Sequence, residues 1–224
     1  MKSPTPAKGV QYINQSGSLL AFPIDNREEP ASLWSSFYPE TAMRWEWDSD
    51  GDDRVPMIWR LREILSRSGK VVYSKWYRGR ATFFSRELFT QLLAATGAYK
   101  KYSNLAQNTG DLSRNAITIL EVLEMDSPLS TKELKATTEM KGKYNEKAYT
   151  KALKELWDRF LIVGYGEKDD GAFPSLLIGS TKNLFEDLWS ESADIDADIA
   201  LGRIKELLPA DSLFLKQFLK NFEL

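Results

Sequence analysis

The side chains best suited to chemistry in this sequence are cations interleaved with aromatic rings. They lie in the segment Lys75-Trp76-Tyr77-Arg78-Gly79-Arg80, flanked by alternating stretches that predict a hairpin over residues 71–85. On nucleic-acid-binding surfaces, cations meet phosphates and aromatic rings stack on bases. The segment therefore indicates a nucleic-acid contact through Lys75, Trp76, Arg78 and Arg80. The alternative is an ordinary hairpin whose Trp76 packs in the core.

A second group of cations falls on one side of an expected helix over residues 145–157. Lys147, Lys151 and Lys154 recur at the spacing of one helical face, opposite an apolar stripe. Such a lysine row can meet phosphates, although acids on the same helix also allow an ordinary solvated face. No arginine–guanine or amide–adenine pair is evident, so backbone contacts are favoured over sequence-specific reading.

Several catalytic classes are excluded by composition. The sequence has no cysteine and no histidine, which removes thiolate and imidazole metal sites, disulfides and the commonest general base. The acidic stretch over residues 48–52 resembles the start of a calcium loop. However, Asp53 replaces the turn glycine, and Trp59 stands where the bidentate glutamate is needed. We expect no catalytic residue, no metal and no cofactor.

The charge of the chain is unevenly distributed although its total is only −2. Residues 54–101 hold eleven Lys or Arg against two acids, whereas residues 183–211 hold eight acids against two cations. The basic span, to which Arg60 on an expected helix over residues 55–67 belongs, is typical of a nucleic-acid footprint. The alternative is a pair of oppositely charged faces that neutralise each other.

Residues 112–180 predict a winged helix-turn-helix. Helices are expected from about Ser113, from about Ser130 and over residues 145–157, followed by a strand over residues 161–166. This module presents one helix to a DNA groove or to a partner protein. The expected wing over residues 163–173 has an acidic tip, which argues against the usual contact of a wing with phosphates.

The organisation expected around this module is α+β and mostly helical. We predict a flexible N-terminal segment (1–18), an N-terminal α+β domain containing the hairpin (19–108), the winged helix-turn-helix (109–180) and a C-terminal helical extension (181–224). No apolar run is long enough to span a bilayer, and the N-terminus lacks an apolar signal region. These features predict a cytoplasmic protein without membrane contact.

The order of short motifs along the chain resembles a known family. The motifs are Trp45-Glu46-Trp47, Arg78-Gly79-Arg80-Ala81-Thr82-Phe83-Phe84-Ser85, Leu112-Ser113-Arg114-Asn115-Ala116-Ile117, Ser127-Pro128-Leu129-Ser130-Thr131-Lys132-Glu133-Leu134, Ala152-Leu153-Lys154-Glu155-Leu156 and Leu161-Ile162-Val163. Over about residues 30–210 the chain resembles the AlkZ-related proteins, small relatives of the AlkZ/YcaQ-type bacterial DNA glycosylases. The resemblance implies tandem winged helices and an association with DNA.

The resemblance does not extend to catalysis. The glycosylases of that group position their nucleophilic water with a Gln-x-Gln motif, and no two glutamines of this chain have that spacing. We therefore expect a winged-helix protein that binds duplex DNA, linked to DNA repair or damaged-DNA recognition. One alternative is a lesion-specific glycosylase that uses a carboxylate such as Asp48 or Asp50. Another is a transcriptional regulator or scaffold that docks a protein partner on the winged helix, using its acidic tail.

Overall fold

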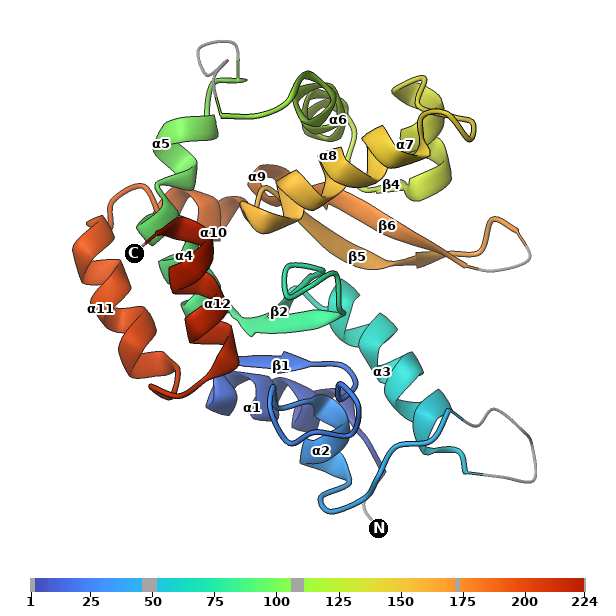
Figure 1. Cartoon of the computed structure of the whole chain (residues 1–224), viewed down its shortest axis with the longest axis vertical. Coiled ribbons are helices and arrows are strands. Elements are labelled where there is room, and N and C mark those ends of the chain that lie inside the picture. Colours follow the sequence, from blue (N-terminus) through green and yellow to red (C-terminus); the bar gives the residue numbers. More distant parts are fainter. Residues whose placement is uncertain (1–2, 46–51, 106–110, 172–173, 224) are drawn as a thin grey trace.

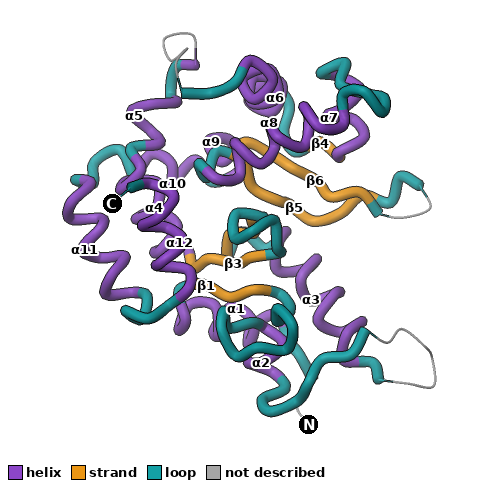
Figure 2. Tube along the Cα trace, viewed as in Figure 1, coloured by secondary structure: helices purple, strands orange, loops and turns teal. Residues whose placement is uncertain are grey.

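One antiparallel sheet of six strands runs through the molecule in the order β1-β3-β2-β5-β6-β4. The structure, a computed structural model, describes residues 3–45, 52–105, 111–171 and 174–223. Figure 2 shows strands in the middle of the molecule and helices around them, as expected for an α+β protein. None of the described helices is both long and apolar enough to cross a membrane.

The first part of the chain supplies half of the strands and the helices packed on them (Figure 1). Its elements are α1 (Pro6–Ser16), β1 (Ser18–Leu20), α2 (Leu33–Phe37), α3 (Arg54–Arg67), β2 (Val71–Ser74), β3 (Thr82–Ser85), α4 (Arg86–Thr96) and α5 (Ala98–Tyr102). The expected hairpin is present as β2 and β3, and β1 adds to its outer edge. Glu46, Trp47 and residues 48–51, including Asp48 and Asp50, lie outside the described residues.

The expected flexible N-terminal segment is wrong over the described residues 5–18. Thr5 caps α1 by accepting a hydrogen bond from the Lys8 amide at 3.4 Å, and Pro6 suits the first helical position. Ile13 is fully buried, and Gly9 lets α1 approach α3 closely, because a Cβ there would lie 3.0 Å from a Leu65 methyl group. The polar composition concealed an amphipathic helix whose stability comes from packing.

The middle of the chain continues the sheet. Its elements are α6 (Arg114–Met125), β4 (Leu129–Ser130), α7 (Thr131–Thr137), α8 (Glu146–Asp158), β5 (Ile162–Lys168) and β6 (Ser175–Ser180). Ser113 and Ser130 cap α6 and α7, with Ser130 forming a reciprocal pair with Glu133. Figure 1 shows α8 lying across the β5–β6 strands, and α6 packs against it.

A single register pair, Tyr73 with Gly164, joins β2 to β5 and so makes one sheet of the two groups of strands. Glycine is needed there, because a Cβ would lie 2.2 Å from Tyr73 Cδ1. The larger hydrophobic cluster also runs from Leu20 through Trp76 and Phe160 to Phe218. The sheet and this core cross the expected domain boundaries near residues 109 and 181, which stay a prediction.

The last part of the chain forms α9 (Thr181–Leu184), α10 (Glu186–Glu191), α11 (Ala197–Leu207) and α12 (Leu213–Phe222). α11 packs against α4, and Figure 1 shows α11 and α12 on the opposite side of the molecule from α3. On the sheet, Val72 and Phe84 face this larger core, whereas Val71 and Phe83 face a second core with α1, α2 and α3. The alternation of side chains along a strand therefore builds two cores on the two sides of one sheet.

Candidate nucleic-acid interface

The tip of the β2–β3 hairpin is a tight turn that carries cations. The Arg80 amide donates a hydrogen bond to the Tyr77 carbonyl at 2.9 Å. Between them, Arg78 has φ of 51° and Gly79 has φ of 72°. Glycine adopts such angles freely, whereas an arginine pays about 1 kcal/mol. The side chains of Arg78 and Arg80 are both exposed at this turn. Of these two cations, Arg78 is the one with a strained backbone conformation.

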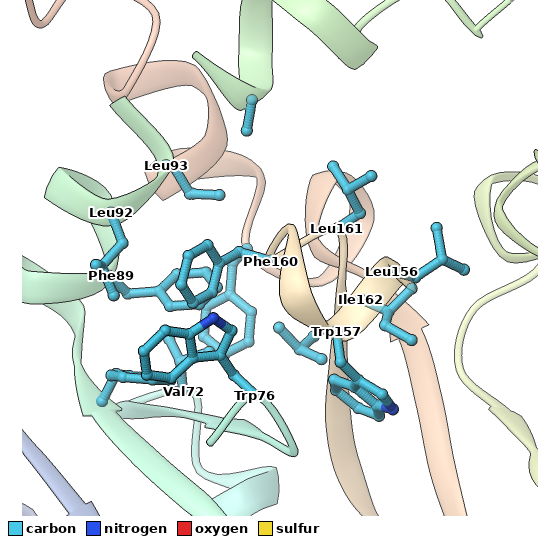
Figure 3. Packing of buried hydrophobic residues seen from close by; sticks show 14 of the residues in the cluster. Val72, Trp76, Phe89, Leu92, Leu93, Leu156, Trp157, Phe160, Leu161 and Ile162 are labelled. Carbon is cyan, nitrogen blue, oxygen red and sulfur yellow. The ribbon is translucent and has the colours of Figure 1, made fainter. Parts of the chain in front are cut away.

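Trp76 is not available for stacking on a base, which corrects the expectation from the sequence. Only 2% of its surface is exposed, and its ring stacks on Phe160 at a centroid distance of 5.4 Å and an interplanar angle of 27°. Figure 3 shows the indole among the core side chains, next to Phe160. Removing so large a ring from water stabilises the fold, and this favours a core position for Trp76 over an exposed position at which it could stack on a base.

The hairpin turn and α8 form the two sides of a cleft of about 330 Å³. Three expected site residues meet there, namely Lys75 and Arg78 from the hairpin turn and Lys154 from α8. The rest of the lining is mostly apolar and comes from Gly79, Thr131, Thr150, Leu153, Trp157, Leu176 and Ile178. A volume near the lower end of small-ligand pockets, with an apolar floor and a few cations, suits one flat or compact anionic group.

The apolar floor was not expected from the sequence. Leu153 and Trp157 follow the apolar stripe of α8, and their spacing predicts only core packing. In Figure 3 the Trp157 ring points away from the stack of Trp76 and Phe160. Leu176 and Ile178 lie on β6, about a hundred residues after the hairpin, so no local pattern could have placed them in the same cleft.

The lysine row of α8 runs beside this cleft. Thr150, Leu153, Lys154 and Trp157 line it at the spacing of one helical face. Lys147 and Lys151 are exposed and fall on the stripe of Lys154, along the edge of that face. Lys154 also forms an ion pair with Asp158 of the same helix, which is exposed and therefore weak.

Arg60 and Arg80 stand outside the cleft lining. Arg80 is exposed two residues from Arg78, at the end of the hairpin turn. Arg60 is exposed on α3, a different element from those that form the cleft. The structure thus brings Lys75, Arg78 and Lys154 together and leaves Arg60 apart from them.

Lys75 differs from the other cations in its surroundings. Its side chain is half-buried, and in the described ranges no hydrogen bond or ion pair engages its amine. Burial, and secondarily the charge of nearby Arg62, lower the pKa of Lys75, while Glu167 offsets part of that effect. Desolvation acts in this direction because it penalises the charged ammonium.

An ion pair between Arg62 and Glu167 joins α3 to β5. The two side chains form an ion pair with exposures of only 8% and 15%, and Arg62 also donates a hydrogen bond to the Tyr73 hydroxyl at 3.4 Å. Arg67 of the same helix donates to the Glu167 carbonyl. These contacts fix the hairpin relative to β5, and the sequence pattern gave no signal for them because the partners lie far apart in the chain.

The acidic turn between β5 and β6 is held against α7. Asp170 accepts hydrogen bonds from Lys132 Nζ at 3.0 Å and from Ser175 Oγ at 2.7 Å, and Lys168 pairs with Glu133. The hydrogen bond from Lys168 and those from Ser130 lower the pKa of Glu133 to about 2. Asp170, one of the acidic residues of this turn, is therefore already paired within the molecule.

Some charges of the basic span pair with the acidic C-terminal part. Arg86 forms an ion pair with Asp187 of α10, and Glu87 pairs with Arg203 of α11. Asp196 caps α11 by accepting from the Asp198 amide at 2.9 Å. These contacts account for part of the opposed charges, and they involve none of the three cations in the cleft. Among the described residues no acidic cluster could hold a metal ion.

An α+β protein with a cation-lined cleft is thus defined by the geometry. A family model described as AlkZ related matches residues 4–212, and the chain belongs to the AlkZ-related family. Membership associates the chain with DNA and with DNA repair. No curated protein and no solved structure matches the chain.

Proposed function

We propose that this protein binds duplex DNA through its phosphate backbone and receives an extruded nucleotide in the cleft between the hairpin turn and α8. One observation carries the proposal: Lys75, Arg78 and Lys154, from segments nearly eighty residues apart, line a single cleft with an apolar floor. Phosphates would meet the exposed cations Arg78 and Lys154, and a base or sugar would lie against Leu153 and Trp157. Extrusion places a damaged nucleotide in such a pocket at least cost, because damage weakens its pairing.

The order of α6, β4, α7, α8, β5 and β6 supports a winged helix-turn-helix. In that interpretation α8 is the recognition helix, and β5 with β6 forms the wing. The acidic turn of the wing is engaged with α7, so the hairpin turn takes over the cationic contact that a wing usually makes. The proposed DNA site is therefore shared by the winged helix and the N-terminal hairpin.

Catalysis by the Gln-x-Gln route is not part of the proposal. No two glutamines have the required spacing, and none of the glutamines that the structure describes lines the cleft. The role we propose is recognition of damaged DNA. A glycosylase that uses Asp48 or Asp50 stays an alternative that involves residues outside the described ranges. A regulator or scaffold that docks a protein partner is the other alternative, and capping by Asp196 gives part of the acidic tail a structural task.

Salt dependence of DNA affinity tests the proposal. If Arg78, Arg80, Lys151 and Lys154 each meet one phosphate, the logarithm of affinity should fall with the logarithm of salt with a slope of about −3.6. Raising salt fourfold would then weaken binding roughly 150-fold. Fluorescence anisotropy of a labelled mixed-sequence duplex measures this slope. The double substitution Arg80→Ala with Lys154→Ala should reduce its magnitude by about 1.8.

A matched control removes two exposed lysines elsewhere. Lys100 on α5 and Lys220 on α12 are exposed and do not line the cleft. Their double substitution by alanine changes the net charge equally but should leave the slope unchanged. Equal losses in both double variants would mean that only overall charge matters. Absence of binding at low salt would overturn the proposal.

A further inference from the structure

Lys75 is the one cation of the cleft whose position suits it poorly for holding a phosphate. Arg78 has an exposed side chain on the hairpin turn, and Lys154 has one on α8, whereas Lys75 is half-buried at the end of β2. In the parts of the chain that the structure describes, its amine has no carboxylate partner and donates no hydrogen bond, although it lines a cleft open to solvent. An amine placed in this way is accessible but only partly hydrated.

Such surroundings favour a lysine that reacts as a nucleophile. Only the neutral amine has a lone pair for attack, and desolvation together with a neighbouring cation increases the neutral fraction. Both conditions hold here, because apolar side chains such as Leu176 and Ile178 line the cleft and burial and Arg62 together lower the pKa of Lys75. A carbonyl group that reaches the cleft would therefore meet a reactive amine.

The other residues of the cleft limit which carbonyl compound would fit. Arg78 and Lys154 come from different elements and provide two positive charges around one small apolar space. The ring-opened form of an abasic nucleotide matches this arrangement. It carries an aldehyde near two phosphates, has a compact five-carbon sugar chain with one free hydroxyl, and lacks the base that would otherwise have to fit in the cleft.

We propose that Lys75 forms a Schiff base with the aldehyde of an abasic nucleotide held in this cleft, an inference that rests on the DNA binding proposed above. The Nζ lone pair attacks the C1′ carbonyl carbon, and the carbon–oxygen π bond breaks to give a carbinolamine. One amine proton moves to the former carbonyl oxygen, which becomes the hydroxyl of the carbinolamine. That hydroxyl then leaves as water together with the second amine proton, and a carbon–nitrogen double bond forms. The protein would in this way hold an abasic site covalently and reversibly.

Borohydride trapping tests the inference. The full chain is incubated with a duplex that carries one central abasic site, sodium borohydride is added, and a covalent adduct is sought on a denaturing gel. Borohydride delivers hydride to the imine carbon, so a reversible Schiff base becomes a stable secondary amine. The same duplex with a tetrahydrofuran analogue, which has no aldehyde, is the substrate control. We expect an adduct with the abasic duplex only, and peptide mass spectrometry should assign it to Lys75.

Variants separate chemistry from binding and folding. Lys75→Arg retains a cation of similar length but cannot form the imine, so it should lose the adduct while it still binds the tetrahydrofuran duplex in anisotropy. Lys75→Ala should lose the adduct as well, and Lys100→Ala should retain it. Circular dichroism verifies that each variant is folded.

The two proposals fail in distinguishable ways. Binding of the tetrahydrofuran duplex without an adduct to the abasic duplex, or an adduct at a different lysine, overturns the role of Lys75 and leaves the proposed DNA binding intact. Absence of binding to every duplex overturns the DNA-binding proposal and, with it, the inference about Lys75.

Discussion

Arg78 allows a test in which stability and DNA binding separate. Its φ of 51° lies in the left-handed region, where a side chain with a Cβ is unfavourable. The guanidinium also lies over the Tyr77 ring, 5.3 Å from the ring centroid. Substitution by glycine or by alanine removes the charge and this ring contact equally. The two variants therefore differ mainly in the cost of the left-handed backbone.

We expect Arg78→Gly to be more stable than Arg78→Ala by about 1 kcal/mol, the cost of placing a Cβ at this backbone conformation. For a chain of this size the difference corresponds to roughly 2–4 °C in Tm. Thermal unfolding followed by circular dichroism measures it. Both variants should lose the same phosphate contact, which lowers the magnitude of the salt slope by about 0.9 in each.

Two results would refute this reasoning independently. Equal Tm values for the glycine and alanine variants would mean that the left-handed turn does not constrain position 78. An unchanged salt slope in both variants would mean that Arg78 does not meet a phosphate, whatever the turn geometry. Arg78→Lys serves as a control, because it retains both the charge and the backbone cost and should keep the wild-type slope.

Three further outcomes follow from the buried groups around the cleft. Trp76→Ala should lower the free energy of unfolding in urea by about 3–5 kcal/mol because it leaves a cavity in the core next to Phe160, and Trp76→Phe should lower it less. Unchanged stability together with a loss of DNA binding would contradict the assignment of Trp76 to the core. Glu167→Gln leaves Arg62 buried without a counter-charge and should lower the free energy of unfolding by about 3–5 kcal/mol. Glu63→Gln removes the partner of Arg67 in a more exposed ion pair and should lower it by about a few tenths of a kcal/mol, and thermal unfolding measures both. Lys75→Met should be more stable than wild type at neutral pH. Because the pKa of Lys75 is lowered in the folded state, wild-type stability rises with pH between the folded pKa and the unfolded value of 10.5. The difference in free energy of unfolding between Lys75→Met and wild type should therefore decrease over that range. A difference that does not change with pH would contradict the lowered pKa.

Local features of this fold could be predicted where residues close in sequence supply the hydrogen bonds and backbone angles that begin or end an element. Ser85 caps α4 by accepting from the Leu88 amide at 3.1 Å, and Gly97 ends that helix in the left-handed conformation, as their positions beside an apolar stripe predict. The hairpin over residues 71–85 and the three helices before β5 were likewise evident. The sequence also predicted the two groups of cations, although not the apolar cleft that Lys75, Arg78 and Lys154 line together.

The sequence by itself determined the helices, the hairpin and the kinds of charge available, because caps, turns and periodicity act over a few residues. Tertiary structure alone decided that Trp76 faces Phe160, that Tyr73 and Gly164 join the strands into one sheet, and that Lys75 meets Lys154 across an apolar floor. Each of these depends on side chains distant in the chain competing for the same space. Which side of a hairpin is buried, and which cation loses its water, is settled by that packing and not by local pattern.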